Sequence, residues 1–133
     1  MHSAGWRIDR GWVTRSGWEA GVAAEALREV LVSRRRPTAL IVASVNAAVG
    51  VVAAGIRSGV RIPDDLSIVA IQDTWVARIT VPSITVVRMP LREAGAAAAR
   101  MLLEHSSGGG LHNMVVTDPA PELVARESTS PPA

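Results

Sequence analysis

The sequence contains no cysteine, phenylalanine, tyrosine or lysine, and it has 14 arginines. The absence of cysteine excludes disulfides, thiolate metal sites and a cysteine nucleophile. Four tryptophans are the only aromatic residues, so the chain has few stacking surfaces of the kind that bind single-stranded nucleic acids. The formal net charge is only +2, so the arginines do not by themselves indicate a nucleic-acid surface.

Long apolar segments are also missing. Residues 1–11 are polar and lack the apolar core of a signal peptide, and the apolar stretch 39–56 is interrupted by Ser44 and Asn46. That stretch falls short of the roughly 18–20 apolar residues that a membrane-spanning helix needs. We therefore expect a cytoplasmic protein with no membrane partner. Its 133 residues, 48% hydrophobic and 20% charged, are typical of one folded domain or of part of a larger one.

Apolar residues at helical spacing mark the first helix. Ser16 and Glu19 have the spacing of a capping box and predict a helix that begins near Gly17 and stops before Pro37. The three arginines at 34–36 are interpreted as the solvated end of this helix, with a phosphate-binding patch as the alternative.

Two further helices follow from the same spacing. Asn46 suits the N-cap of a helix that ends at Gly59, the left-handed position beyond its last turn. Another helix follows Pro90 to residue 104, with a single apolar stripe on one face. Residues 106–110 are interpreted as a flexible link.

Short apolar runs predict the strands. Residues 38–43 and 67–71 are typical of strands buried on both faces of a parallel sheet, and with the helix between them they form a βαβ unit. Residues 84–88, 113–117 and 122–126 are further strand candidates, whereas 72–83 is predicted to be a loop.

This alternation predicts an α/β fold with a parallel sheet flanked by helices. In such folds ligands bind outside the carboxyl ends of the strands. That rule selects Ser44, Val45, Gln72 and Asp73, which follow the first two strands. Trp12 precedes the first helix at the same expected end, where it either contacts a ligand or covers the sheet edge.

Residues for catalysis or metal binding are not found at a useful spacing. None of the three histidines stands at a metal-ligand spacing from another, and no nucleophile and base are placed by a motif. Asp64 and Asp65 follow Pro63 and are better explained by a turn. We expect neither an enzyme nor a cofactor.

Four segments in order along the chain resemble a known family. They are residues 36–39 (RPTA), 59–69 (GVRIPDDLSIV), 82–90 (PSITVVRMP) and 122–129 (ELVAREST). Together they resemble the effector-binding domain of lac-repressor (LacI/GalR) family transcriptional regulators. The resemblance implies one lobe of a periplasmic-binding-protein-like (type I) fold, in which two lobes enclose a cleft.

The resemblance also implies a division of the chain. Residues 1–90 and 112–128 would form the C-terminal lobe, the helix at 91–105 would pack on the N-terminal lobe, and 129–133 would be a frayed tail. The helix-turn-helix that binds operator DNA in the family is absent, so the chain resembles a truncated member. A helix without its lobe exposes its apolar stripe, which favours association.

Site residues follow from the same resemblance. Trp12 occupies a position where family members stack an aromatic ring on the ligand. The family has Asn-Asp where this chain has Ser44 and Val45, and a ligand-binding Asp where it has Gln72, while Asp73 is retained. Ser44, Gln72, Asp73 and Trp12 are therefore the candidate contacts for a small polar effector, a sugar or related metabolite.

Dimer contacts are suggested at two positions of the second helix. Family resemblance places Val49 and Ala53 on the dimer face, and core packing on the sheet is the equal alternative for each.

The function predicted from the sequence is the effector-sensing and dimerisation part of a LacI-type regulator. A stand-alone small-molecule-binding protein or a dimerisation module without DNA binding is the alternative.

Overall fold

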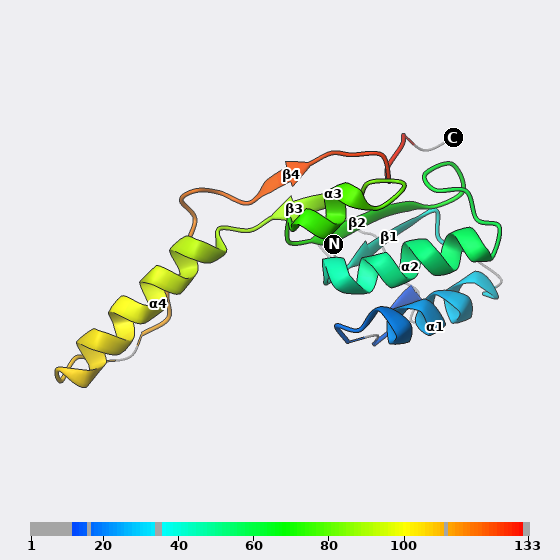
Figure 1. The fold of residues 1–133 in the computed structure, drawn as a ribbon. Coiled ribbons are helices and arrows are strands. Elements are labelled where there is room, and N and C mark those ends of the chain that lie inside the picture. The colour runs from blue at the N-terminus through cyan, green and yellow to red at the C-terminus, as the bar shows by residue number, and fades with distance from the viewer. Residues whose placement is uncertain (1–11, 16, 34–35, 111, 132–133) are drawn as a thin grey trace, which may run out of the picture.

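The computed structural model describes residues 12–15, 17–33, 36–110 and 112–131. Its elements, in chain order, are α1 (Ala20–Leu31), β1 (Ala39–Val42), α2 (Val45–Arg57), β2 (Ser67–Ile71), α3 (Trp75–Ile79), β3 (Thr85–Arg88), α4 (Leu91–Ser106) and β4 (Glu122–Val124) (Figure 1). The strands form one sheet in the order β1-β2-β3-β4. The first three strands are parallel and β4 is antiparallel to β3, so the α/β prediction is confirmed with a mixed rather than a wholly parallel sheet.

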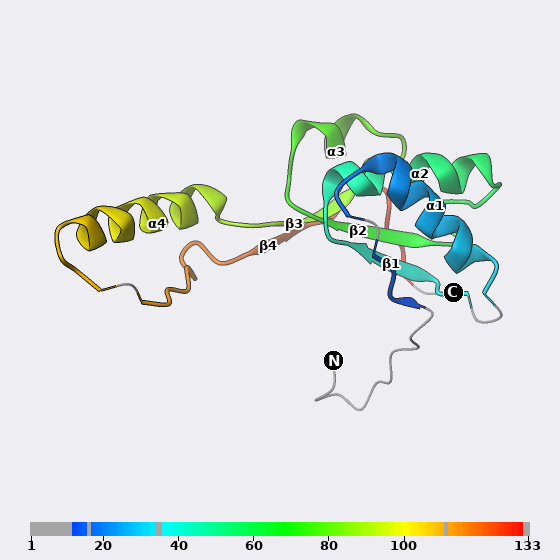
Figure 2. The same ribbon diagram turned by 90° about the horizontal axis from the view of Figure 1, so that it is seen from below.

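The core lies on one face of the sheet. The pairing of Val42 with Ala70 and of Ala70 with Val86 places these buried side chains on the same face. The same cluster contains buried side chains of both first helices, including Ala23 and Leu27 of α1 and Ala48 and Val52 of α2. Helices α1 and α2 therefore cover this face together, and Figure 2 shows them side by side.

The opposite face of the sheet is open at β1. Ile41 is 70% exposed, and Val69 and Ile71 of β2 are only half-buried. The predicted burial of the first strand on both faces is therefore wrong for the part of the chain that the structure describes. The apolar run was read correctly as a strand, but β1 is the outermost strand and only one of its faces meets a helix.

Glycine allows α1 and α2 to approach each other closely. A Cβ atom on Gly50 would lie 1.9 Å from the carbonyl oxygen of Ala20. No side chain larger than hydrogen fits between the two backbones at this point.

The helix starts differ from the prediction. Helix α1 begins at Ala20 with Glu19 as its N-cap and no side-chain cap bond, and Ser16 of the predicted capping box lies outside the described residues. Helix α2 begins at Val45 with Ser44, not Asn46, as its N-cap. Because Ser44 is already extended and its carbonyl accepts from the Ala48 amide at 3.0 Å, the helix starts directly after β1 without a loop.

The end of α2 agrees with the prediction. Gly59 has a φ of +76°, and the amides of Gly59 and Val60 donate to the carbonyls of Ile56 and Gly55, each at 3.0 Å. This pair of bonds is a Schellman motif, which needs a left-handed residue at the position of Gly59.

Two parts of the predicted element order are wrong. The expected loop at 72–83 contains the short helix α3, and the expected strand at 113–117 is an extended segment without sheet pairing. A five-residue helix is too short to show a helical period. The short apolar run within 113–117 does not form a strand, because it pairs with none of the described strands.

Helix α4 leads away from the sheet and residues 112–117 return beside it (Figures 1 and 2). We call α4 and residues 112–117 the arm. A groove of about 610 Å³ runs between them and is lined mainly by apolar side chains. Within α4 only Ala97 is buried, and Leu91, Leu102 and Leu103 are exposed. Pro90 is the N-cap of α4, so the helix follows it as predicted.

The segment after β4 is tied to the sheet by hydrogen bonds. The Ser128 hydroxyl donates to the Ile68 carbonyl at 2.6 Å and accepts from the Thr85 amide at 2.9 Å. The Thr129 hydroxyl lies 2.9 Å from that of Thr85, and the Ser130 amide donates to the Ser67 hydroxyl at 3.2 Å. The predicted frayed tail at 129–133 therefore does not apply to residues 129 and 130. None of the described helices is long and apolar enough to span a bilayer.

Candidate functional site

Strand register brings two predicted site residues to one edge of the sheet. Val42 pairs with Ala70, and Ser44 and Gln72 each follow two residues after a member of this pair. Because β1 and β2 are parallel, both residues leave the sheet at its carboxyl edge. This is the edge at which ligands bind in open α/β sheets.

Ser44 joins β1 to α2. It is 5% exposed, and its hydroxyl makes no bond to the first amides of the helix. The start of α2, at the carboxyl end of β1, therefore carries both this hydroxyl and the amides of the first helical turn as hydrogen-bonding groups.

Gln72 has an unusual backbone. Its φ of +84° is the only positive φ of a non-glycine residue among those described. Its amide donates to the Val87 carbonyl at 2.8 Å, which fixes the residue against β3. A left-handed conformation without glycine is strained, and such residues are concentrated at functional sites. The side chain is half-buried at the edge of the sheet.

Asp73 is surrounded by arginines. Its Oδ2 accepts from Nη2 of Arg88 at 2.7 Å and lies 3.4 Å from Nη2 of Arg78, and its Oδ1 accepts from Nη2 of Arg126 at 2.7 Å. The Asp73 side chain is 2% exposed. Burial alone would raise the pKa of Asp73, but the hydrogen bonds from Arg88 and Arg126 and the charges of Arg126 and Arg78 outweigh it and lower the pKa to about 2.

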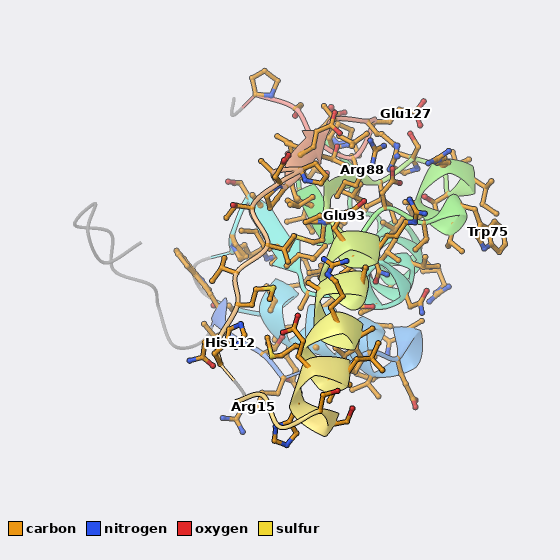
Figure 3. All side chains as sticks on the ribbon, turned by 90° about the vertical axis from the view of Figure 1, so that its left-hand side faces the viewer. Arg15, Trp75, Arg88, Glu93, His112 and Glu127 are labelled. Carbon is orange, nitrogen blue, oxygen red and sulfur yellow. The ribbon has the colours of Figure 1, made fainter. Side chains whose placement is uncertain are left out.

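The arginines around Asp73 have further partners. Nη1 of Arg88 donates to Oε2 of Glu122 at 2.9 Å, and Nη1 of Arg126 donates to the Ile84 carbonyl at 2.8 Å. Figure 3, viewed from the side of α4, shows Arg88 and Glu93 where the arm meets the sheet. The carboxylate of Asp73 is thus committed to protein cations. The sequence alone could not show this, because Arg88 and Arg126, which make the two 2.7 Å hydrogen bonds, are distant along the chain.

Trp12 lies at the outer edge of β1. It is 36% exposed and lines a pocket of about 260 Å³ between α1 and β1, together with Leu40, Ile41 and Ala43. The lining of this pocket reaches the residue before Ser44 but does not include Ser44, Gln72 or Asp73. The structure thus brings Ser44 and Gln72 to one edge and places Trp12 against the side of the sheet.

The proposed dimer residues lie next to an exposed apolar surface. Val49 and Ala53 are half-buried on α2, and Val49 packs against the core. Helix α3, which packs against α2, exposes Trp75 by 69% and Ile79 by 64%, and Val81 beyond it is 82% exposed. Figure 3 shows Trp75 projecting from the margin of the molecule. The sequence signal for this surface is the i, i+4 spacing of Trp75 and Ile79, which was missed because 72–83 was predicted as a loop.

Across the described ranges, no group of three or more histidine, cysteine, aspartate or glutamate side chains could hold a metal ion. The arrangement at the strand ends offers hydroxyl, amide and guanidinium groups instead.

Known proteins match this fold and sequence closely. The family model of the periplasmic binding protein-like domain matches residues 1–129. A LacI family transcriptional regulator from Mycobacterium smegmatis is 46% identical, with a TM-score of 0.92 over 99% of this chain and 49% of its own. The HTH-type transcriptional regulator DegA of Bacillus subtilis (strain 168) is 37% identical over 132 residues, which are 98% of this chain and 38% of DegA.

One matching structure is a complex with a sugar. It is a complex of the transcriptional regulator CelR with cellobiose, 26% identical to this chain, with a TM-score of 0.84 over 96% of this chain and 38% of its own. The chain therefore spans between 38% and 49% of the length of these three proteins. It belongs to the LacI family of transcriptional regulators, and it matches the C-terminal part of their periplasmic-binding-protein-like, effector-binding domain.

Proposed function

We propose that this chain is the effector-sensing part of a LacI-type regulator and that the carboxyl ends of β1 and β2 form one wall of a cleft for a small polar metabolite. The observation that carries the proposal is the left-handed backbone of Gln72, at φ +84°, on the edge where such a ligand would bind. This conformation holds the Gln72 side chain in a direction that an extended strand would not give it.

The chemistry of the wall favours a ligand rich in hydroxyl groups. The Gln72 amide offers both a donor and an acceptor, and the Ser44 hydroxyl can also do both. The cellobiose bound to CelR, which shares the fold, supports a sugar as the ligand class. Asp73 is held by three arginines. Its role in this proposal is to fix the place of the neighbouring Gln72, not to contact the ligand.

The other wall of the cleft would come from the part of the regulator that this chain does not span. Residues 1–90 and 112–128 would form one lobe, and the helix at 91–105 would pack on the second lobe through the apolar groove of the arm. Operator DNA would be bound by a helix-turn-helix elsewhere in the full-length protein, which would act in the cytoplasm and without catalysis.

The same proposal includes a dimer formed by two copies. Trp75 and Ile79 on α3 and Val81 just beyond it expose apolar side chains, and α3 packs against α2, which carries Val49 and Ala53. Exposed apolar side chains at helical spacing are typical of an interface. A polar substitution at Trp75 is the direct test of this dimer.

Calorimetry on the full-length regulator tests the ligand proposal, with glucose, galactose and cellobiose as titrants. We expect binding of at least one sugar and a loss of at least about tenfold in affinity for Gln72→Ala, the size expected for losing paired polar contacts to a ligand. Ser58→Ala, at the far end of α2, is the control and should leave the affinity unchanged. No heat from any sugar, or equal affinities for wild type and Gln72→Ala, would contradict the proposal.

A further inference from the structure

The arm is connected to the sheet by two segments, one leading out and one leading back. Strand β3 leads into α4, and the returning chain re-enters the sheet as β4 (Figure 1). At the point where both segments leave the sheet, Arg88 at the end of β3 pairs with Glu122 at the start of β4. The direction of the arm therefore depends on what holds these residues.

A single buried carboxylate holds both segments. Asp73 accepts from Arg88 at the end of β3 and from Arg126 just beyond β4, the strand in which the returning segment ends, each at 2.7 Å. Arg88 also reaches Glu122 at 2.9 Å, so its guanidinium bridges β2 and β4 across the end of β3. The planar, forked guanidinium suits this bridging role because it can donate to two carboxylates at fixed angles.

The same carboxylate is attached to the candidate ligand residue. Asp73 follows Gln72 directly, and the Gln72 amide donates to the carbonyl of Val87, the residue before Arg88. The Gln72 backbone is therefore linked to β3 through this hydrogen bond and to Arg88 and Arg126 through Asp73.

We propose that Arg88 is a positioning residue that, with Asp73 and Arg126, fixes the direction in which the arm leaves the sheet and links that direction to Gln72. The link to ligand binding rests on the proposed function, whereas the control of the arm does not. We assign Arg88 this structural role rather than a ligand contact, because its Nε and both Nη atoms each donate a hydrogen bond to Asp73 or Glu122.

Arg78 provides a matched control on the same carboxylate. It also approaches Oδ2 of Asp73, at 3.4 Å, but it belongs to α3, which is not part of either connecting segment. Arg78→Gln therefore removes a charge beside Asp73 without releasing the arm. Arg88→Lys keeps the positive charge but loses the forked guanidinium, so it should hold the arm better than Arg88→Gln does but less well than arginine.

Distance measurements between spin labels test the proposal on this chain. Because the sequence has no cysteine, Ser58→Cys on the body and Ala99→Cys on α4 create a unique labelling pair, both at exposed positions. In the chain with Arg88, we expect a narrow distribution of the distance between the two labels. The width of this distribution should at least double with Arg88→Gln and take an intermediate value with Arg88→Lys. It should not change with Arg78→Gln.

Two results would overturn the proposal: an unchanged width with Arg88→Gln, or equal broadening with Arg78→Gln. Urea unfolding of each labelled variant distinguishes a released arm from a generally destabilised fold. If only the arm is released, the unfolding transition of the rest of the chain stays at the same urea concentration. The measurement needs no ligand, so its failure is distinguishable from failure of the sugar-binding proposal.

Discussion

The backbones of Ala20 and Gly50 are in contact, with space for a hydrogen atom but not for a methyl group on residue 50. This contact sets the distance between α1 and α2, which together cover the core face of the sheet. It therefore lends itself to a direct test of the fold.

Gly50→Ala should destabilise the chain by about 1–3 kcal/mol, because the added methyl group must push the two helices apart. Chemical denaturation monitored by tryptophan fluorescence or circular dichroism gives the free energy of unfolding. Gly21→Ala is the matched control: it lies in α1 with open space around it and should stabilise the helix by about 0.5–1 kcal/mol. Two variants of equal stability would contradict this account of the contact.

Ser128→Ala should destabilise the fold by about 1–3 kcal/mol, because it leaves the buried Ile68 carbonyl and Thr85 amide without their hydroxyl partner. The same unfolding measurement applies. Ser130→Ala removes an exposed side chain whose described bonds use only its backbone, so its effect should stay within about 0.5 kcal/mol. A smaller effect at Ser128 than at Ser130 would show that the tail is not held as described.

The stability contributed by Asp73 should depend on pH. Because the pKa of Asp73 is about 2 in the folded chain and 3.8 in its ordinary state, the ionised carboxylate stabilises the fold above the ordinary pKa. That contribution is lost as the pH falls from about 4 to 2. Urea unfolding of wild type and Asp73→Asn should therefore show a large difference at pH 6 that shrinks steadily below pH 4. A difference that is constant with pH would remove the carboxylate as its cause.

Trp75→Ser should shift the chain from dimer to monomer, since it removes the largest apolar side chain of the exposed α3 surface. Sedimentation velocity at several concentrations measures the change in mass. Trp18→Ser is the control, because Trp18 is exposed to a similar extent, 71%, but precedes α1. If both variants sediment like the wild type, α3 is not the dimer surface.

The sequence predicts best where local and tertiary signals agree. The second strand is predicted with its observed bounds, because the residues after Ser67 are apolar and the strand is paired on both sides by parallel neighbours. Gly59 was identified correctly because a helix end with a left-handed residue is encoded within a few positions.

The errors arise where tertiary contacts override local preference. Ser44 rather than Asn46 is the N-cap of α2, because β1 leads directly into the helix. The polar composition of the tail predicts a solvated segment, whereas the Ser128 hydroxyl bridges Ile68 and Thr85. For the site, the edge carrying Ser44 and Gln72 followed from the strand rule. The role of Asp73 did not, because its three arginine partners come from α3, β3 and the chain beyond β4.

The open side of β1 also affects how the chain behaves at high concentration. The sequence of β1, Ala-Leu-Ile-Val, has no charge or proline of the kind that protects edge strands, and its outward side chain Ile41 is 70% exposed. Among the described residues, no strand pairs with the outer edge of β1, and unpaired amides and carbonyls on such an edge are templates for strand addition from another molecule. Intermolecular sheet growth at β1 therefore competes with solubility, and a lysine at position 41 would oppose it by placing a charge on the growing face.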